Sequence, residues 1–394
     1  MTGKTLLPIG SMTKRSARPQ DLCGRRGLTG CYVDSVLAAY VSGHGYGHAT
    51  RVGEVLRALR TLEPRATLAI VTAGPERLYR QAIPGVFEFR SLECDVGLVQ
   101  KDALVMDEAA TVERWRAFVA QDDRRIADEA RWLREKGAGV VLGDIPPLAF
   151  AAAAEAGIPS VALSNFSWDW IYRYMSARHP GLAEAAAWAA ASYRRAGLLL
   201  QLPFAGDLGT FPRREEIPLV ARRPRVTRAE ARRRLGLPAG PLALVSFGGI
   251  GLPGFDPAVL GRLEGWRFLV TTAAAALPSN VAAVDVAGLG ARGLGYIDVV
   301  AAADVVVTKP GYGIVSDAIA ARTRMVYTER GDFPEYPVIV GEMGRWLPGR
   351  HVSNADLVAG RLRPALEAAL GAPFPDPPDM TGALRAARRL LEAV

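Results

Sequence analysis

Cysteine and histidine are scarce in this sequence of 394 residues. Its three cysteines, Cys23, Cys31 and Cys94, are too few and too scattered for a disulfide framework or a zinc cluster. No uninterrupted run of about 18 apolar residues occurs, so no membrane-spanning helix is predicted. The N-terminal stretch also lacks the apolar core and cleavage site of a secretory signal. These absences favour a protein of the reducing cytoplasm.

Positive charge is concentrated in two segments. The net charge is +8, but residues 1–34 hold six Lys or Arg against two Asp, and residues 213–234 hold nine Arg against three Glu. The rest of the chain therefore carries a net charge of −2. A basic tail and one basic segment are weak indicators of nucleic-acid binding, which we do not expect. They favour a solvated arginine-rich helix, and a peripheral contact with a membrane surface is the alternative.

Apolar segments alternate between strand-like and helix-like patterns, which predicts an α/β fold with parallel sheets. The strand-like runs are residues 36–42, 66–73, 139–144 and 159–165, and then 242–249, 266–272, 304–313 and 323–329. The alternation breaks over residues 206–240. There, Thr227 and Glu230 have the spacing of a capping box, and Gly236 has the position of a C-cap glycine.

This pattern predicts two Rossmann-like domains. With 49% hydrophobic residues, the chain is long enough to build two buried cores. The expected parts are a disordered extension (1–34), a first domain (35–205), a linker with a basic helix (206–240), a second domain (241–360) and a C-terminal helix that packs back on the first domain (361–394).

Half of the four histidines lie in one turn, GHGYGH (43–48), between the first strand and the first helix. Ligands of open parallel sheets bind beyond the carboxyl ends of the strands, and glycines such as Gly45 and Gly47 let the backbone approach a ligand. The spacing differs from the dinucleotide-binding G-x-G-x-x-G pattern. A lone histidine is usually structural, but His44 and His48 together at this edge favour function. Imidazole is suited to take a proton from a hydroxyl or from water.

Further polar residues follow the next strands of the first domain. Asp144 ends a strand at the same edge, where it either orients a histidine, binds a ligand hydroxyl, or merely begins a turn. The segment SNFSWDWIYRYM (164–175) contains Asn165, Trp168 and Asp169 among several aromatic residues. Such aromatic runs are more often packing than sugar-binding platforms. We nevertheless name Asn165, Trp168 and Asp169 as candidate acceptor contacts.

Glycine loops also follow two strand-like runs of the second half. One contains Gly248 and Gly249 in SFGG (246–249), and the other is TKPGYGIVSDAIA (308–320). Unhindered backbone N–H groups and a following helix N-terminus favour an anion such as phosphate. The predicted ligand contacts of the second loop are Pro310, Gly311, Gly313, Ser316 and Asp317.

Carboxylates near this loop are candidates for binding sugar hydroxyls. Asp317 lies one turn into the predicted helix, where it could accept both hydroxyls of a ribose. Asp332 and Glu335 lie in ERGDFPEYP (329–337), after another strand. The alternative is that these are ordinary turns with surface carboxylates. It is less favoured for the two glycine loops, because both fall on the same edge of the sheet.

Together these features resemble the GT-B glycosyltransferase superfamily, whose two Rossmann-like domains face each other across a cleft. The stretch GYIDVVAAADVVVTKPGYGIVSDAIA (295–320) is similar to the donor site of the peptidoglycan N-acetylglucosaminyltransferases. That resemblance implies that backbone near Ile297 reads the uracil, and that Gly311 and Gly313 face the diphosphate. It also implies that Asp317 holds the ribose, with a shorter reach than the glutamate usual in that family.

Two further resemblances concern the first domain as well. YVSGHGYGHATR, NFSWDWIY, SFGG and KPGYGIVSDA occur in the same order in the glycosyltransferase-like N-terminal half of the L-arabinokinases, over roughly residues 38–345. The kinase glycine loop of their other half does not occur here, so arabinose phosphorylation is not expected. GYGHATR (45–51) resembles the G-x-G-H-x-x-R pattern of a UDP-sugar hydrolase of pseudaminic acid biosynthesis, whose histidine activates water. This match implies that His48 is the base and that Arg51 assists it. His44 has no counterpart in the pattern, so we expect it to be a secondary hydrogen-bond donor to the acceptor or to the transferred sugar.

The sequence thus predicts an inverting, metal-independent glycosyltransferase that uses a nucleoside-diphosphate sugar, with UDP favoured, and a hydroxyl or amine acceptor. His48, His44 and Asp144 are the catalytic candidates, and Arg51 is grouped with the donor-binding residues. No D-x-D motif for a metal occurs, and no cofactor is expected beyond the donor co-substrate. The alternatives are a nucleotide-sugar hydrolase and a non-catalytic regulatory protein that binds nucleotide sugars.

Overall fold

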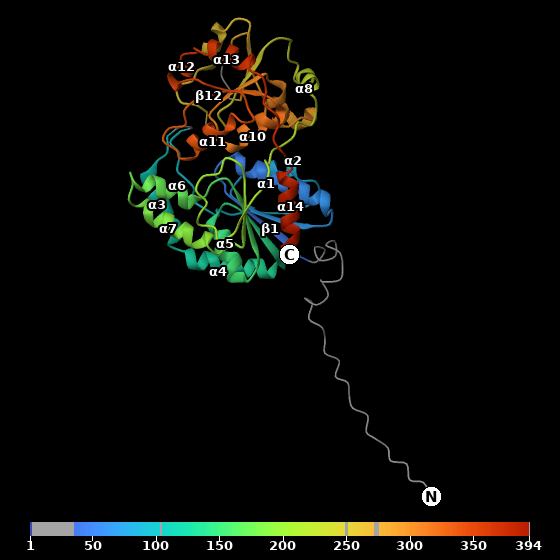
Figure 1. Ribbon diagram of the computed structural model, residues 1–394, viewed down its shortest axis with the longest axis vertical. Helices are drawn as coiled ribbons and strands as arrows, with labels where there is room; N and C mark the ends of the chain where they lie inside the picture. The colour runs from blue at the N-terminus through green and yellow to red at the C-terminus, as the bar shows by residue number, and fades with distance from the viewer. Residues whose placement is uncertain (2–34, 103–104, 249–250, 272–275, 394) are drawn as a thin grey trace.

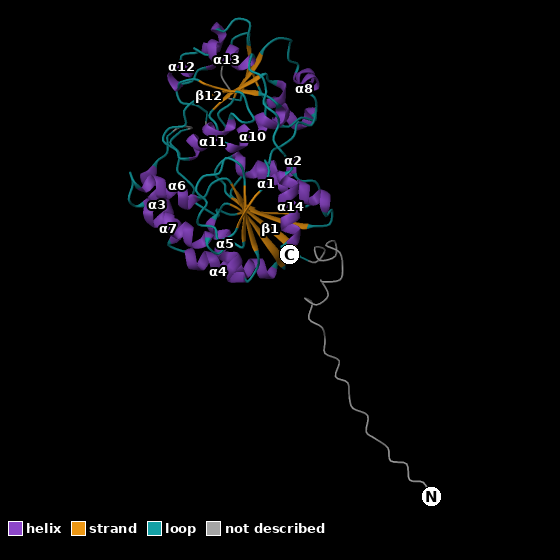
Figure 2. Ribbon diagram, in the orientation of Figure 1, coloured by secondary structure: helices purple, strands orange, loops and turns teal. Residues whose placement is uncertain are grey.

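A computed structural model describes residue 1 and residues 35–393, except for 103–104, 249–250 and 272–275. The predicted extension, apart from Met1, and the predicted ligand contact Gly249 lie outside the described residues. The described chain forms two lobes, each with a central sheet surrounded by helices (Figures 1 and 2).

The sheet of the first lobe, in the described part of the chain, has seven parallel strands in the spatial order β3 (Glu88–Ser91), β2 (Thr67–Thr72), β1 (Val36–Val41), β4 (Ala138–Asp144), β5 (Ser160–Ser164), β6 (Leu198–Gln201) and β7 (Arg214–Glu216). The strand order reverses between β1 and β4. This doubly wound arrangement places a ligand crevice beyond the carboxyl ends of those two strands.

The sheet of the second lobe repeats this plan with six described parallel strands, in the order β10 (Val281–Ala283), β9 (Arg267–Val270), β8 (Leu242–Val245), β11 (Val305–Thr308), β12 (Arg324–Tyr327) and β13 (Gly349–His351). Its order reverses between β8 and β11. The predicted α/β class and the two Rossmann-like domains are therefore confirmed.

Helices cover both faces of each sheet (Figure 2). Those of the first lobe are α1 (Tyr46–Leu62), α2 (Glu76–Ala82), α3 (Glu108–Val119), α4 (Asp122–Glu135), α5 (Pro147–Ala156), α6 (Trp168–Ser176) and α7 (Leu182–Tyr193). Those that follow are α8 (Arg228–Leu235), α9 (Tyr296–Ala302), α10 (Tyr312–Ala321), α11 (Glu335–Met343), α12 (Asn354–Val358), α13 (Arg363–Leu370) and α14 (Gly382–Glu392), with short 3₁₀ helices at Pro257–Arg262 and Ala287–Arg292.

Side chains that point alternately to the two faces of the central strands build the apolar cores. In β1, Leu37, Ala39 and Val41 pack into one apolar cluster, while Ala38 and Tyr40 pack into another on the opposite face, as the two-residue period of a strand requires. The first cluster continues into the second lobe. The two sheets are thus joined by continuous apolar packing.

The linker and the C-terminal part differ in detail from the expected parts. Residues 206–240 supply β7 to the first sheet, and α8 packs on α9 of the second lobe, where Arg232 pairs with Asp304 at 2.8 Å. Thr227 caps α8 as expected, but Glu230 pairs with Arg233 and Arg234. Its carboxylate is drawn to these cations instead of completing a capping box.

The last two helices pack on different lobes. Helix α13 packs against β12 and β13 of the second lobe, whereas α14 lies along α1 of the first lobe (Figure 1). The return of the chain to the first domain therefore involves α14 and not the whole of residues 361–394. None of the helices in the described residues combines the length and apolar character needed to cross a bilayer.

Candidate active site

The strand register brings several of the predicted first-domain residues together. Val41 at the end of β1 pairs with Asp144 at the end of β4, and the Ser42 amide donates to the Asp144 carbonyl at 2.8 Å. The turn after β1 passes through Gly45, whose φ of 92° favours glycine, and then enters α1. The first two turns of α1 therefore lie beside Asp144.

His48 and Asp144 form a buried pair at this crevice. The Nδ1 atom of His48 lies 2.9 Å from Oδ1 of Asp144, and the ring packs edge-on against Phe166. Asp144 is fully buried, and His48 is 7% exposed. Of the roles left open for Asp144, the structure supports the orientation of a histidine.

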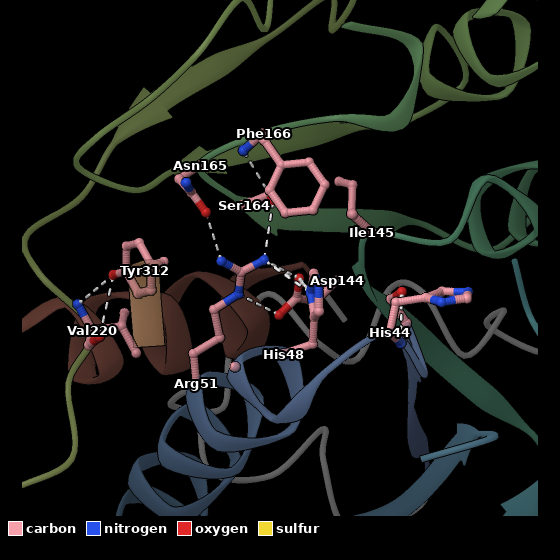
Figure 3. A network of polar contacts seen from close by, with 12 residues as sticks. His44, His48, Arg51, Asp144, Ile145, Ser164, Asn165, Phe166, Val220 and Tyr312 are labelled. Atoms are coloured by element: carbon pink, nitrogen blue, oxygen red, sulfur yellow. Dashed lines mark hydrogen bonds and ion pairs between the residues drawn. The ribbon is translucent and has the colours of Figure 1, made fainter. Parts of the chain in front are cut away.

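Arg51, one helical turn after His48, fixes the other side of this carboxylate. Its Nε donates to Asp144 Oδ2 at 2.6 Å and its Nη2 to Oδ1 at 2.5 Å. The same guanidinium donates to the side chains of Asn165 (2.8 Å) and Ser164 (3.2 Å) and lies over the ring of Tyr312 (Figure 3). Arg51 therefore organises the pair, and its guanidinium is engaged within the protein.

These contacts determine the charge states of Asp144 and Arg51. Burial alone would raise the pKa of Asp144, but the charges of Arg51 and then His48 outweigh it, so the pKa of this carboxyl is lowered. Burial disfavours the Arg51 cation, but Asp144 more than compensates, so the pKa of Arg51 is raised. The site thus holds a carboxylate and a guanidinium beside the imidazole.

His44 lies apart from this pair (Figure 3). Its Nε2 atom is 3.5 Å from a carboxylate oxygen of Asp95, and its ring packs edge-on against Trp168. Trp168 is buried, and its indole N–H donates to Asp95 at 2.8 Å. The structure therefore places Trp168 in packing and gives His44 a different carboxylate partner from His48.

The other acceptor candidates are engaged within the protein. Asp169 is fully buried and accepts hydrogen bonds from Ser167 and from Thr210, the latter at 2.6 Å. Asn165 is also fully buried and lies between Arg51 and Glu335 of the second lobe. Its Oδ1 accepts from Arg51, while its Nδ2 donates to Glu335 Oε1 at 2.8 Å.

The predicted glycine loop of the second lobe meets the first lobe directly. A Cβ atom placed on Gly313 would lie 3.2 Å from Cα of Gly47, so the first turns of α10 and α1 approach with little room for a side chain. Gly311 is the N-cap of α10, and the side chain of Ser316 donates to the Gly313 carbonyl at 2.9 Å. Pro310 is buried beside them, and Gly248 has a positive φ of 76° after β8.

Asp317, the predicted ribose ligand, is already paired. Its carboxylate is buried and accepts hydrogen bonds from Nε (3.1 Å) and Nη2 of Arg222. Arg222 comes from the segment between the lobes. Arg222 also lies over the ring of Tyr296, whose hydroxyl donates to Ser246 at 2.7 Å. Ile297 is buried in the next position of α9. A ribose at Asp317 would have to share this carboxylate with Arg222.

The two carboxylates after β12 lie at the contact between the lobes. Asp332 is exposed and accepts from Tyr174 at 2.5 Å and from Arg178, both in or near α6. Glu335 is buried and accepts from Arg330 Nη1 at 2.6 Å as well as from Asn165. Both were predicted as donor ligands, and in this arrangement both link the lobes.

Two cationic side chains lie near the glycine loop: Arg330, from the same ERGDFPEYP segment as the predicted ligands Asp332 and Glu335, and Lys309, which the sequence analysis did not single out. The Nη1 atom of Arg330 lies 3.8 Å from the position of a Cβ on Gly311, beside the N-terminus of α10. Lys309 lies in that loop directly after β11, and burial, with the nearby charge of Arg330, lowers its pKa to about 8. Their positions at the end of β11 and after β12 were the available signal, because loops at one sheet edge converge.

Comparisons with known proteins agree with this architecture. No protein-family model matches the chain. L-arabinokinase from Arabidopsis thaliana is 31% identical over 368 residues, which cover 92% of this chain and 35% of that protein. The chain therefore spans about a third of the length of this relative. The predicted similarity to L-arabinokinases is confirmed.

Solved glycosyltransferases share the fold over most of the chain. The kitacinnamycin glycotransferase aligns with a TM-score of 0.57 at 21% identity, covering 91% of this chain and 95% of that one. The calicheamicin glycosyltransferase CalG4 gives 0.54 at 18%, covering 91% and 94%. UGT89C1 from Arabidopsis thaliana, complexed with UDP, gives 0.56 at 14%, covering 91% and 95%.

The chain has the GT-B fold. In this fold the crevices of the two sheets face each other. Here His48 and Asp144 lie at the switch point of the first sheet, and the N-terminus of α10 follows β11 at the switch point of the second. The GT-B arrangement thus brings the buried imidazole and the glycine loop together.

Proposed function

We propose that this protein is an inverting glycosyltransferase that moves a sugar from a nucleoside-diphosphate sugar, with UDP favoured, to a hydroxyl or amine acceptor. The observation that carries the proposal is the buried His48–Asp144 pair, 2.9 Å apart, at the switch point of the first sheet. UDP is favoured because UGT89C1, a structural neighbour, was crystallised with UDP.

His48 serves as the general base. Because Nδ1 faces Asp144, Nε2 on the opposite edge of the ring takes the proton from the acceptor. The acceptor oxygen or nitrogen then bonds to the anomeric carbon while the bond to the diphosphate breaks, and the diphosphate leaves with the electron pair. Asp144 holds the ring and stabilises the imidazolium that forms.

Inversion follows from a single displacement. A retaining mechanism with a covalent intermediate needs a carboxylate that can reach the anomeric carbon. Asp144 is fully buried, and both of its oxygens accept hydrogen bonds from Arg51. Glu335 is similarly occupied by Asn165 and Arg330. Direct attack by the acceptor is therefore the step that this arrangement favours.

Groups of the second domain stabilise the departing diphosphate. The N-terminus of α10, with Gly311 and Gly313, offers backbone N–H groups and the positive end of the helix dipole. Arg330 and Lys309 add positive charge near the same loop. Such preorganised charge takes over the part that a metal ion plays in other transferases, so the proposal includes no metal.

A thermal-shift panel of UDP-, GDP- and TDP-sugars tests the donor. A true donor present at about 100 times its dissociation constant should stabilise the protein by about 2.7 kcal/mol and raise its melting temperature. No shift with any nucleotide would count against the donor site. Free sugar released at full rate without an acceptor would favour the hydrolase alternative. Donor binding without turnover, unchanged in His48→Ala, would favour a regulatory binding protein.

A further inference from the structure

A continuous chain of polar contacts, buried except at its partly buried end, links the two domains at the candidate base. Arg51 holds Asp144 and donates to Asn165, Asn165 donates to Glu335, and Glu335 accepts from Arg330. Figure 3 shows the first-domain part of this chain, with the guanidinium of Arg51 between the Asp144 carboxylate and the Asn165 amide. The far end lies beside Gly311, at the N-terminus of α10.

The chemistry of this chain requires an amide at its centre. The Oδ1 of Asn165 accepts from a cation, while its Nδ2 donates to a carboxylate. Asn165 is fully buried and Glu335 is 4% exposed, so water is a poor substitute for either contact. An aspartate at 165 could accept from Arg51 but would face Glu335 with a second negative charge.

We propose that Asn165 and Glu335 are positioning residues that hold the His48–Asp144–Arg51 group in its working geometry when the donor-binding loops are docked on the first domain. Glu335 begins α11 and Arg330 follows β12, so their contacts with Asn165 depend on the approach of the two domains. Domain approach and orientation of the base are thereby coupled. The inference rests on the proposed function only for its kinetic readout.

Exchanging the amide and the carboxylate between residues 165 and 335 tests the proposal. Asn165→Asp should lower kcat by about 10- to 100-fold because it sets two carboxylates against each other and disturbs Arg51. In the double variant Asn165→Asp/Glu335→Gln, the amide of residue 335 donates to the carboxylate at 165 and still accepts from Arg330. The double variant should recover to within about fivefold of the original kcat. The donor KM of Asn165→Asp should change by less than about threefold.

Tyr174→Phe is the matched control. It removes another contact between the domains, the hydrogen bond from Tyr174 to Asp332, away from Arg51. If the polar chain served only to hold the domains together, this variant and Asn165→Asp would have similar effects. The proposal expects Tyr174→Phe to leave kcat within about twofold.

Histidine-selective NMR provides a readout without activity. The chain has four histidines, and the ring resonances of His48 are assigned by their loss in His48→Gln. In protein saturated with UDP, they should move in Asn165→Asp and return in the double variant. If the resonances move and return in this way but no sugar transfer is detected, the positioning proposal stands and the proposed function is contradicted. Unmoved resonances with unchanged kcat, or no recovery in a folded double variant, would overturn the positioning proposal. Should Asn165→Asp not fold, Glu335→Gln alone replaces it, because it differs from the double variant only at residue 165.

Discussion

In the first domain the candidate chemistry is carried by buried side chains, whereas in the second domain it is carried by a glycine loop and a helix end. His48, Asp144, Arg51 and Asn165 are each less than 8% exposed and are joined by directed hydrogen bonds. The second domain presents the N-terminus of α10 after Gly311.

This difference predicts unequal sensitivity to substitution. A base acts through one nitrogen atom, so a single change removes it, and buried charges that lose their partner destabilise the fold. Backbone N–H groups persist whatever the side chain, and several of them share the charge of a diphosphate. Substitutions in the first domain should therefore change kcat most, and those in the second domain should change donor affinity moderately.

The largest effect is expected for His48→Gln. Loss of the base should lower kcat by about 10³-fold, while the donor-induced thermal shift stays unchanged, because the proposed donor site lies in the second domain. His351→Gln is the control, since His351 is an exposed residue paired only loosely with Glu329 at 3.3 Å. Equal activity of the two variants would remove His48 from the mechanism.

Asp144→Asn should combine a catalytic and a structural loss. Arg51 would lose its buried counter-charge, which is expected to cost about 3–5 kcal/mol of unfolding free energy, and kcat should fall by at least about 10²-fold. Asp317→Asn breaks the corresponding pair in the second domain, where Arg222 is 21% exposed and better hydrated. Urea denaturation should show the smaller loss for Asp317→Asn. The reverse order would contradict the comparison of the two domains.

Gly313→Ala tests the close approach of the domains. The new methyl group would meet Cα of Gly47 at 3.2 Å, so α10 and α1 must separate slightly, and kcat should fall by about tenfold. Gly341→Ala is matched to it, because Gly341 also lies in a helix of the second domain and its Cβ position has no heavy atom within 4 Å. A kcat that is unchanged in Gly313→Ala would show that this contact is not needed.

The smallest effect concerns pH and Lys309. Its pKa of about 8 means that the ammonium is present at pH 7 and largely lost at pH 9. Because the charged form attracts the diphosphate, affinity for UDP should fall by at most about tenfold over this interval. Isothermal titration calorimetry at the two pH values measures it. In Lys309→Arg the decrease should nearly vanish, and an equal decrease there would assign it to another group.

Much of this architecture was accessible from the sequence. Strand-like runs ended by glycine or proline located the sheet edges, and His48 and Arg51 share a helix face because they are three residues apart. The sequence left several roles open for Asp144. The parallel register of β1 and β4 places its carboxylate beside His48, 96 residues away.

Contacts between the domains could not be predicted in this way. Asn165 and Glu335 are 170 residues apart, and Arg222 reaches Asp317 from a segment expected to be a linker. Periodicity reports on local structure and on burial, but it does not specify which surfaces meet when two domains pack. Asn165, Asp317 and Glu335 were predicted as ligand contacts, and the partners that each has within the protein were not predicted.

The stereochemistry of the first product tests the central claim most directly. The protein is incubated with an α-linked UDP-sugar, selected by the thermal-shift panel, with and without a pool of hydroxyl-bearing acceptors. Proton NMR then follows the anomeric coupling of the earliest product. We predict a β-linked product whose formation requires an acceptor and is lost in His48→Gln. An α-linked product, or free sugar formed equally fast without acceptor, would contradict inverting transfer by a His48 base.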